Sequence, residues 1–178
     1  MSRLFFALDI SNEDKQIIDD FNTQNLTVQF KVIPKHNYHI TLCFLGAINT
    51  VHKEILVQKA TKLTLQLAPI TVGSLLIDHV GLFKRPKVLY LGSSVIPDWL
   101  LQLASELTNT AKTLTLFQEN RNYQPHISIG RKALFIPDIH STPKLAIKIK
   151  SFSLYQSISL NNEVNYKPVK TWYLDKSQ

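Results

Sequence analysis

Two short segments of the sequence carry residue types that suit acid–base chemistry. His39-Ile40-Thr41-Leu42 and His126-Ile127-Ser128-Ile129 share one pattern, in which a histidine, an aliphatic, a hydroxyl and a second aliphatic residue follow one another. The two histidines stand 87 residues apart, about half the length of the 178-residue chain. A single tetrad of this kind says little, because a histidine on an alternating strand is usually a hydrogen-bonded structural residue. Its repetition on a second apolar segment favours an active site.

The strand period explains why these tetrads matter. Successive side chains of a β-strand point to opposite faces, so the histidine and the hydroxyl share one face and the two aliphatic residues share the other. If the two strands lie side by side, two imidazoles and two hydroxyls meet in one small volume. We therefore predict that His39 and His126 are catalytic and that Thr41 and Ser128 bind the substrate.

This set of groups suits the cleavage of a phosphodiester. One imidazole removes a proton from the attacking oxygen and the other protonates the leaving oxygen, since a pKa of about 6.5 allows both roles near neutral pH. The hydroxyls donate hydrogen bonds to the non-bridging phosphate oxygens, where charge accumulates. Neither tetrad contains a carboxylate or a cysteine, which are common metal ligands. We predict a reaction without a metal or another cofactor.

The elements that position the tetrads follow an irregular order typical of an α+β fold. Helices are predicted to begin near Ser11, Thr50 and Pro97, and Ser11 with Asp14 resembles a capping box. The second helix is expected to reach about residue 62, and 61–67 suits a helix or a strand. The segment 79–87 contains a glycine and a proline and is predicted to be a turn or loop. Strands are predicted at 4–10, 38–45, 69–77, 88–92, 127–129, 145–155 and 165–174, with Gly46 closing the second and a turn at 161–162 before the last.

The composition bounds the class of protein. The hydrophobic fraction is 44% and the charged fraction 19%, which supports one packed domain over residues 1–178 and argues against global disorder. No segment resembles a signal peptide or approaches the roughly 20 apolar residues of a membrane span. The single cysteine, Cys43, cannot form an internal disulfide. We therefore expect a cytoplasmic protein that does not contact membranes.

The charge balance favours an anionic partner. The formal net charge is +7 and the isoelectric point about 9.5. Such a balance favours polyanions, with nucleic acid first, although many basic proteins never bind it. The basic residues are scattered along the chain and do not form a block of the kind that marks a disordered basic tail.

With both tetrads in view, the sequence resembles the RNA 2′,3′-cyclic phosphodiesterase family, also called 2′-5′ RNA ligases, of the two-histidine phosphoesterase superfamily. The first tetrad lies in the family-like segment 37–46, and the second follows Gln124-Pro125. The other matching segments are Arg3-Leu4-Phe5-Phe6-Ala7-Leu8, Asn120-Arg121, Phe152-Ser153-Leu154-Tyr155-Gln156-Ser157, Tyr166 and Pro168. One departure is Ser128, where threonine is more usual; serine keeps the hydrogen-bond donor.

The resemblance implies a fold and a reaction. The fold is a bilobal α+β structure in which two antiparallel sheets face a central cleft and the helices lie outside. The reaction is the hydrolysis of a 2′,3′-cyclic phosphate on RNA ends or nucleotides to a 2′-phosphomonoester, with reversible 2′-5′ ligation in some members. By the same resemblance, His126 is the base that activates water and His39 is the acid that protonates the 3′-oxygen. We expect a monomer.

Further candidates for substrate binding lie near the tetrads. Arg131 occupies a position where the family often has an arginine, but strict alternation places it on the face opposite His126 unless Gly130 interrupts the strand. Phe83 and Tyr123 are candidates for stacking on bases, against core packing as the alternative. The basic residues Lys84, Arg85 and Lys87 are either an RNA-attracting rim or part of a solvated loop.

Other functions share these features. One is an RNA- or nucleotide-binding module with weak catalysis or none, and another is a phosphodiesterase for a different cyclic phosphate or a 2′-5′ oligonucleotide. Both are compatible with the tetrads, and a panel of substrates tested in EDTA separates them. The direction of the reaction, hydrolysis or ligation, is not set by the sequence, because catalysis accelerates both directions.

Overall fold

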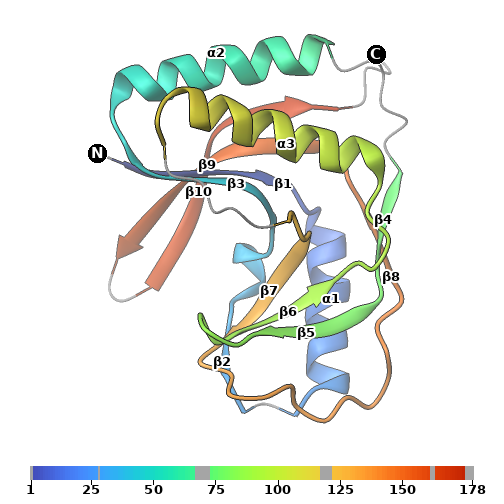
Figure 1. Cartoon of the computed structure of the whole chain (residues 1–178). Helices are drawn as coiled ribbons and strands as arrows, with labels where there is room; N and C mark the ends of the chain where they lie inside the picture. Colours follow the sequence, from blue (N-terminus) through green and yellow to red (C-terminus); the bar gives the residue numbers. More distant parts are fainter. Residues whose placement is uncertain (1, 28, 67–72, 117–121, 161–162, 175–178) are drawn as a thin grey trace.

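The protein, whose structure is a computed structural model, has two lobes that meet at a bend (Figure 1). The structure describes residues 2–27, 29–66, 73–116, 122–160 and 163–174. The helices are α1 (Asn12–Asn25), α2 (Thr50–Gln66) and α3 (Asp98–Thr113), with a 3-10 turn η1 (Lys35–Asn37). The strands are β1 (Ser2–Leu8), β2 (Lys31–Val32), β3 (Ile40–Ile48), β4 (Ser74–Ile77), β5 (His79–Phe83), β6 (Val88–Gly92), β7 (His126–Arg131), β8 (Leu145–Lys148), β9 (Ser151–Leu160) and β10 (Glu163–Tyr173).

The larger sheet runs through both lobes in the order β10-β9-β1-β3-β7-β6-β5, with β2 added beside β7. All of its pairs are antiparallel, and β3 meets β7 at a single residue pair, Ile40 with Ile127. The α+β class and the two facing antiparallel halves are therefore confirmed. The halves form one continuous sheet because the two tetrad strands touch at this one point.

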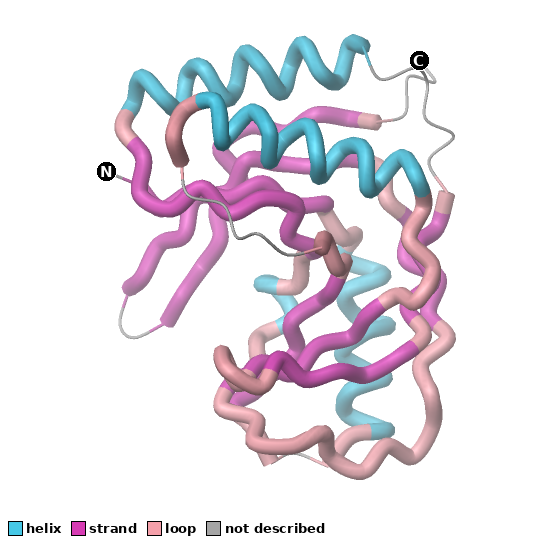
Figure 2. The backbone as a smooth tube through the Cα atoms, in the orientation of Figure 1, coloured by secondary structure: helices cyan, strands magenta, loops and turns pink. Residues whose placement is uncertain are grey.

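The helices lie outside the two halves of the sheet. Helices α2 and α3 cover the first lobe, which is built from β10, β9, β1 and β3. Helix α1 lies behind the second lobe, which contains β7, β6 and β5 (Figure 1). The small β4–β8 ribbon runs beside both lobes, and the connection from β7 to β8 passes around the outside of the second lobe (Figure 2). No helix among the described residues is long and apolar enough to cross a membrane.

The aliphatic residues of both tetrads belong to the core. Ile40 and Ile127 are 0% exposed, and Leu42 and Ile129 are almost as fully buried. The same buried cluster continues into both lobes, from Leu8 of β1 to Leu89 of β6. The alternation predicted from the sequence therefore holds, and the polar faces of both tetrads are turned away from the core.

Three predicted boundaries were wrong. Residues 79–87 are not a loop, because β5 occupies His79–Phe83 and the turn is confined to 84–87. Gly81 lies inside that strand: a Cβ at this position would stand 2.3 Å from Tyr90 Cζ, so the missing side chain gives room to the tyrosine ring. Gly46 does not close β3 but lies within it at an irregular register with β1, with a φ of 71°. The segment 145–155 divides into β8 and β9.

The helix starts agree with the sequence patterns. Ser11 Oγ accepts a hydrogen bond of 3.0 Å from the Asp14 amide, whereas the Asp14 carboxylate accepts one from the Lys148 amide on β8. Helix α2 continues to Gln66, which settles the ambiguous segment 61–66 as helix. Residues 67–72 and the predicted turn at 161–162 lie outside the described residues, as does the Asn120-Arg121 part of the resemblance.

Candidate active site

His39 is held at the entrance to β3 by two hydrogen bonds of its ring. Nδ1 lies 2.7 Å from the Asn37 carbonyl, which can only accept, so Nδ1 carries the hydrogen. Nε2 lies 3.1 Å from Thr41 Oγ1. In the neutral ring Nε2 has a lone pair, so the Thr41 hydroxyl donates to it. Asn37 is itself fixed, because its side-chain amide donates to the Val164 carbonyl of β10.

Aromatic rings from other strands surround the His39 imidazole. The Phe5 and Tyr166 ring centroids lie 5.0 Å and 4.9 Å from that of His39. Burial lowers the pKa of His39 to about 4, against the opposing effect of its hydrogen bond to Asn37. The positive charges of His126, Lys15 and Arg131 act in the same direction as burial. His39 is therefore uncharged at neutral pH, with Nε2 able to accept a proton.

His126 repeats the backbone contact of His39 at the start of β7. Its Nδ1 lies 2.8 Å from the carbonyl of Gln124, which precedes His126 by two residues. Asn37, which binds Nδ1 of His39, precedes that histidine by the same number. The carbonyl again requires the hydrogen on Nδ1. Phe83 meets the His126 ring edge-on with a centroid distance of 4.8 Å, and Tyr90 does so at 5.6 Å. Both tetrads therefore direct Nε2, rather than Nδ1, away from the backbone.

The strand register brings the two tetrads together. Ile40 pairs with Ile127 in an antiparallel arrangement. One step along that register sets His39 opposite Ser128 and Thr41 opposite His126, on the shared polar face. His39, Thr41, His126 and Ser128 all line one cleft of about 440 Å³. This volume exceeds what a single phosphate group fills, so the cleft has room for more of a substrate.

Arg131 also lines this cleft, although strict alternation places it on the opposite face. The register between β6 and β7 slips here, because Leu89 pairs with Gly130 while the next residue, Tyr90, pairs with Ser128. The extra residue on β7 is a β-bulge, which turns the following side chain toward the other face. Gly130 also makes room for Phe30, since a Cβ there would lie 2.2 Å from its ring.

The two candidate stacking residues lie in different surroundings. Phe83 is half-buried and stacks on Tyr90 at a centroid distance of 4.2 Å, beside His126. Tyr123 packs against the core, and burial raises the pKa of its hydroxyl. That hydroxyl has no hydrogen-bond partner in the described part of the chain. Phe83 therefore lies close to the His126 imidazole, whereas Tyr123 has the surroundings of a packing residue.

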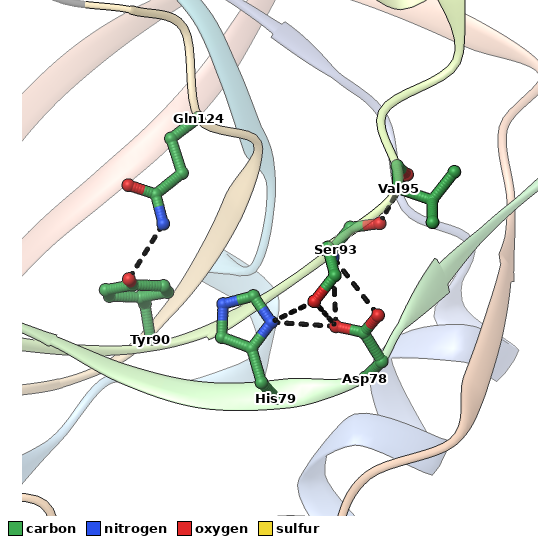
Figure 3. Close-up of polar contacts among 7 residues, drawn as sticks. Asp78, His79, Tyr90, Ser93, Val95 and Gln124 are labelled. Carbon is green, nitrogen blue, oxygen red and sulfur yellow. Dashed lines mark hydrogen bonds and ion pairs between the residues drawn. The ribbon is translucent and has the colours of Figure 1, made fainter.

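A polar network that includes Asp78 and His79 lies beside Tyr90 in the second lobe (Figure 3). His79 Nδ1 lies 2.7 Å from Asp78 Oδ1, and the Ser94 hydroxyl donates to the same carboxylate at 3.1 Å. The Ser94 hydroxyl also lies 3.5 Å from His79 Nδ1, so serine and aspartate meet the same ring nitrogen. In a nucleophilic triad they meet opposite nitrogens. Gln124 Nε2 donates to the Tyr90 hydroxyl at 2.8 Å, which ties the residue before the second tetrad to β6.

Several residues of the cleft were not predicted from the sequence to be site residues. Arg3, Ser157 and Ser159 line the end nearest β1 and β9. Arg3 pairs with Ser157 across these strands, so their side chains share the face of the sheet that carries Phe5. Strand alternation from Phe5 provides the signal that finds Arg3. Among the described residues, no group of three or more histidine, cysteine, aspartate or glutamate side chains is arranged to hold a metal.

Comparison with known proteins shows which family the chain belongs to. A family model described as LigT-like phosphoesterase matches residues 8–90, which include the first tetrad. The RNA 2′,3′-cyclic phosphodiesterase of Escherichia coli K12 is 31% identical over 176 residues, covering 97% of this chain and 96% of that protein. This chain belongs to the LigT-like phosphoesterase family.

Other LigT-like proteins match over the same length. The RNA 2′,3′-cyclic phosphodiesterase of Methanocaldococcus jannaschii is 28% identical, covering 96% of this chain and 99% of that protein. The crystal structure of E. coli LigT complexed with 3′-AMP has a TM-score of 0.87 at 29% identity and covers 99% of both chains. The E. coli LigT structure complexed with ATP has a TM-score of 0.83 at 27% identity, covering 98% of this chain and 99% of that one.

Proposed function

We propose that this protein is an RNA 2′,3′-cyclic phosphodiesterase that hydrolyses the cyclic phosphate at RNA ends to a 2′-phosphomonoester. The observation that carries the proposal is the matched pair of histidines, each with Nδ1 bound to a carbonyl and with both rings on one cleft. The relatives named RNA 2′,3′-cyclic phosphodiesterase support the same reaction. The complex of E. coli LigT with 3′-AMP supports a nucleotide as the ligand of this cleft.

In the proposed reaction water attacks phosphorus in line with the bond to the 3′-oxygen. One imidazole accepts the water proton at Nε2, and the other donates a proton from Nε2 to the departing 3′-oxygen. The new P–O bond replaces the broken one, which leaves a 2′-phosphomonoester and a 3′-hydroxyl. The Thr41 hydroxyl, which donates to His39 in the free protein, turns to a non-bridging oxygen together with Ser128. Arg131 adds a positive charge at the same cleft.

The two imidazoles are not equivalent in the free protein. The family resemblance assigns His126 as base and His39 as acid. The pKa of His39, lowered by burial to about 4, favours the reverse in the unliganded state, because an uncharged imidazole is a base. His39 acts as the acid only if the bound phosphate anion raises its pKa by stabilising the imidazolium.

Replacement of either histidine tests the reaction. His39→Ala and His126→Ala are each expected to lower kcat on an RNA ending in a 2′,3′-cyclic phosphate by at least about 10²-fold, the loss typical of general acid–base catalysis. The assay contains EDTA and detects the 2′-phosphomonoester. His140→Ala is the matched control, because His140 is exposed and lies outside the cleft lining. Near-normal rates in either tetrad variant contradict the proposal.

The same variants assign the two roles. A p-nitrophenyl phosphodiester has a leaving group that departs without a proton, so a variant without the acid keeps much more of its activity on it than on the cyclic phosphate. A variant without the base loses activity on both substrates. Recovery in His39→Ala supports the roles taken from the family, and recovery in His126→Ala supports the reverse.

The state and partners of the protein follow from the same site. All the side chains of the proposed machinery come from a single chain. We propose a monomer that acts on RNA ends or nucleotides, and the single cysteine, Cys43, supports a location in the cytoplasm. Full activity of a species that elutes as a monomer in size-exclusion chromatography supports this proposal. Activity confined to an oligomeric fraction contradicts it.

A further inference from the structure

Six exposed basic residues lie on the chain segments that meet around the end of β7, where Arg131 lines the cleft. Lys31 of β2 pairs with Arg131 on one side, and Val88 of β6 pairs with it on the other. The 84–87 turn between β5 and β6 and strand β2 therefore meet beside the end of β7 (Figure 1). We call this group the cationic strip; its members are Lys31, Lys84, Arg85, Lys87, Arg131 and Lys132.

In the described part of the chain, no carboxylate forms an ion pair with a member of the strip. Within the described ranges the two ion pairs join Lys35 to Asp19 and His79 to Asp78, and neither involves a member of the strip. Lys31 and Arg131 are also paired directly across two strands, where like charges repel each other. The folded chain thus holds positive charges together in a place where a polyanion would relieve their repulsion.

Two lysines of the strip have a backbone conformation that lysine rarely adopts. The φ angle is 52° at Lys87 and 60° at Lys132. Glycine and asparagine adopt this left-handed region with less strain, because the Cβ of other residues approaches the following carbonyl. Strained backbone of this kind is concentrated at functional sites. Lysine is therefore an unfavourable residue for the backbone at both positions. Its presence there favours a role for the two side chains.

We propose that the cationic strip binds the phosphodiester backbone of the RNA strand that leads to the cyclic phosphate. This inference rests on the proposed function and adds the end of the cleft by which the RNA strand leaves. Arg131 stands three residues beyond Ser128, about 10 Å along β7. A strand whose terminal phosphate lies between the histidines therefore reaches the strip within its first nucleotides.

The strip makes the protein selective for oligonucleotide ends over free cyclic nucleotides. Lysine and arginine bind phosphates without reading the bases, so the selectivity is for chain length and not for sequence. A cyclic mononucleotide occupies the space between the tetrads and has no phosphate left for the strip. An RNA with the same terminal nucleotide has one phosphate for each further residue.

The test compares two substrates in the full-length protein. These are cytidine 2′,3′-cyclic monophosphate and a short single-stranded RNA that ends in the same nucleotide. The double variant Lys87→Gly/Lys132→Gly is expected to fold at least as stably as the wild type, because glycine relieves both left-handed positions. Its kcat/KM on the RNA is expected to fall about 10-fold, with no change on the mononucleotide. The salt dependence of kcat/KM on the RNA should become shallower by roughly 0.7 for each phosphate that the variant no longer binds.

Two further variants locate the effect. Lys59→Gln/Lys62→Gln removes the same charge from the exposed face of α2 and is expected to leave the preference for RNA unchanged. Arg3→Gln removes a charge at the opposite end of the cleft. If Arg3→Gln abolishes the preference and the strip variant keeps it, the strand leaves by the other end and the inference is wrong. Equal losses on both substrates also overturn it.

A binding measurement separates this inference from the proposed function. Fluorescence anisotropy with a labelled RNA ending in a 2′-phosphate reports affinity without catalysis. Weaker binding by the strip variant supports the strip, even if the wild type hydrolyses neither substrate. Failure of the wild type to hydrolyse either substrate refutes the proposed function and leaves the binding result in place. Unchanged binding by the strip variant refutes the strip, whether or not the wild type hydrolyses the mononucleotide.

Discussion

The two histidines of the cleft have the same backbone contacts but different surroundings. Each donates Nδ1–H to the carbonyl two residues earlier, which fixes the tautomer and orients the ring. Phe83 and Tyr90 flank His126, whereas Phe5 and Tyr166 flank His39, and burial lowers the pKa of His39 to about 4. A pair of titratable groups in unlike environments is a common basis for dividing acid and base roles.

The lowered pKa of His39 predicts how stability changes with pH. In the unfolded chain the imidazole takes up a proton near its ordinary pKa of about 6.5, whereas in the folded protein it does so near 4. Between these values the unfolded state binds more protons, so this contribution to stability is complete above about pH 6.5 and is lost as the pH falls toward 4.

Replacing His39 isolates this contribution from those of other groups. His39→Gln is expected to show a smaller loss in the free energy of unfolding than the wild type between pH 7 and pH 4.5, as measured by urea denaturation. The exposed His140→Gln serves as the comparison. Parallel curves for wild type and His39→Gln would mean that the folded protein does not depress the His39 pKa.

At the scale of the elements, glycines decide how rings lie on the face of the second lobe. A Cβ on Gly81 of β5 would stand 2.3 Å from Tyr90 Cζ, and one on Gly92 of β6 would stand 2.4 Å from His79 Nε2. The small residues allow Tyr90 to lie across β5 and to contact both Phe83 and His126. The packing of β5 on β6 thus helps to position the second tetrad.

Gly81→Ala is expected to reduce stability and activity together. The added methyl group forces the Tyr90 ring away, and overpacking of this kind lowers the free energy of unfolding by about 1–3 kcal/mol. Displacement of Tyr90 also loosens its packing on His126. Gly73→Ala is the control, because a Cβ there meets nothing within 4 Å. Chemical denaturation and kcat on the cyclic phosphate measure both effects, and an unchanged Gly81→Ala variant would refute this account of the ring.

At the scale of the whole molecule, the two lobes share their interior. One buried cluster includes Leu103 of α3 and Phe152 of β9 in the first lobe and Leu89 and Ile127 in the second. Lobes that share a core in this way have no separate cores to unfold independently. We therefore expect the single domain predicted from the sequence to behave as one cooperative unit.

Thermal unfolding tests this expectation because the tryptophans report on one lobe. Trp99 lies on α3 and Trp172 on β10, so their fluorescence follows the first lobe, whereas far-UV circular dichroism follows both. The two signals are expected to give the same Tm, as in a two-state transition. A second transition seen by circular dichroism alone would show that the lobes unfold separately.

The sequence by itself determined which faces of their strands the residues of the two tetrads occupy. Strand alternation is a local property of the backbone, so the shared face of His39 with Thr41 and of His126 with Ser128 was readable from the residues alone, as were the helix starts at Ser11 and Pro97. A different local signal, the glycine and proline of 79–87, wrongly predicted a loop, because Gly81 makes room for the Tyr90 ring inside a strand.

Only the tertiary structure decided how these residues meet. The pairing of Ile40 with Ile127 joins strands 87 residues apart, and no local pattern sets that register. The bulge that brings Arg131 to the cleft depends on the partner strand β6, and the low pKa of His39 depends on rings from β1 and β10. The orientation of the two histidines thus follows from local backbone geometry, whereas their charge state and the cations beside them follow from long-range packing.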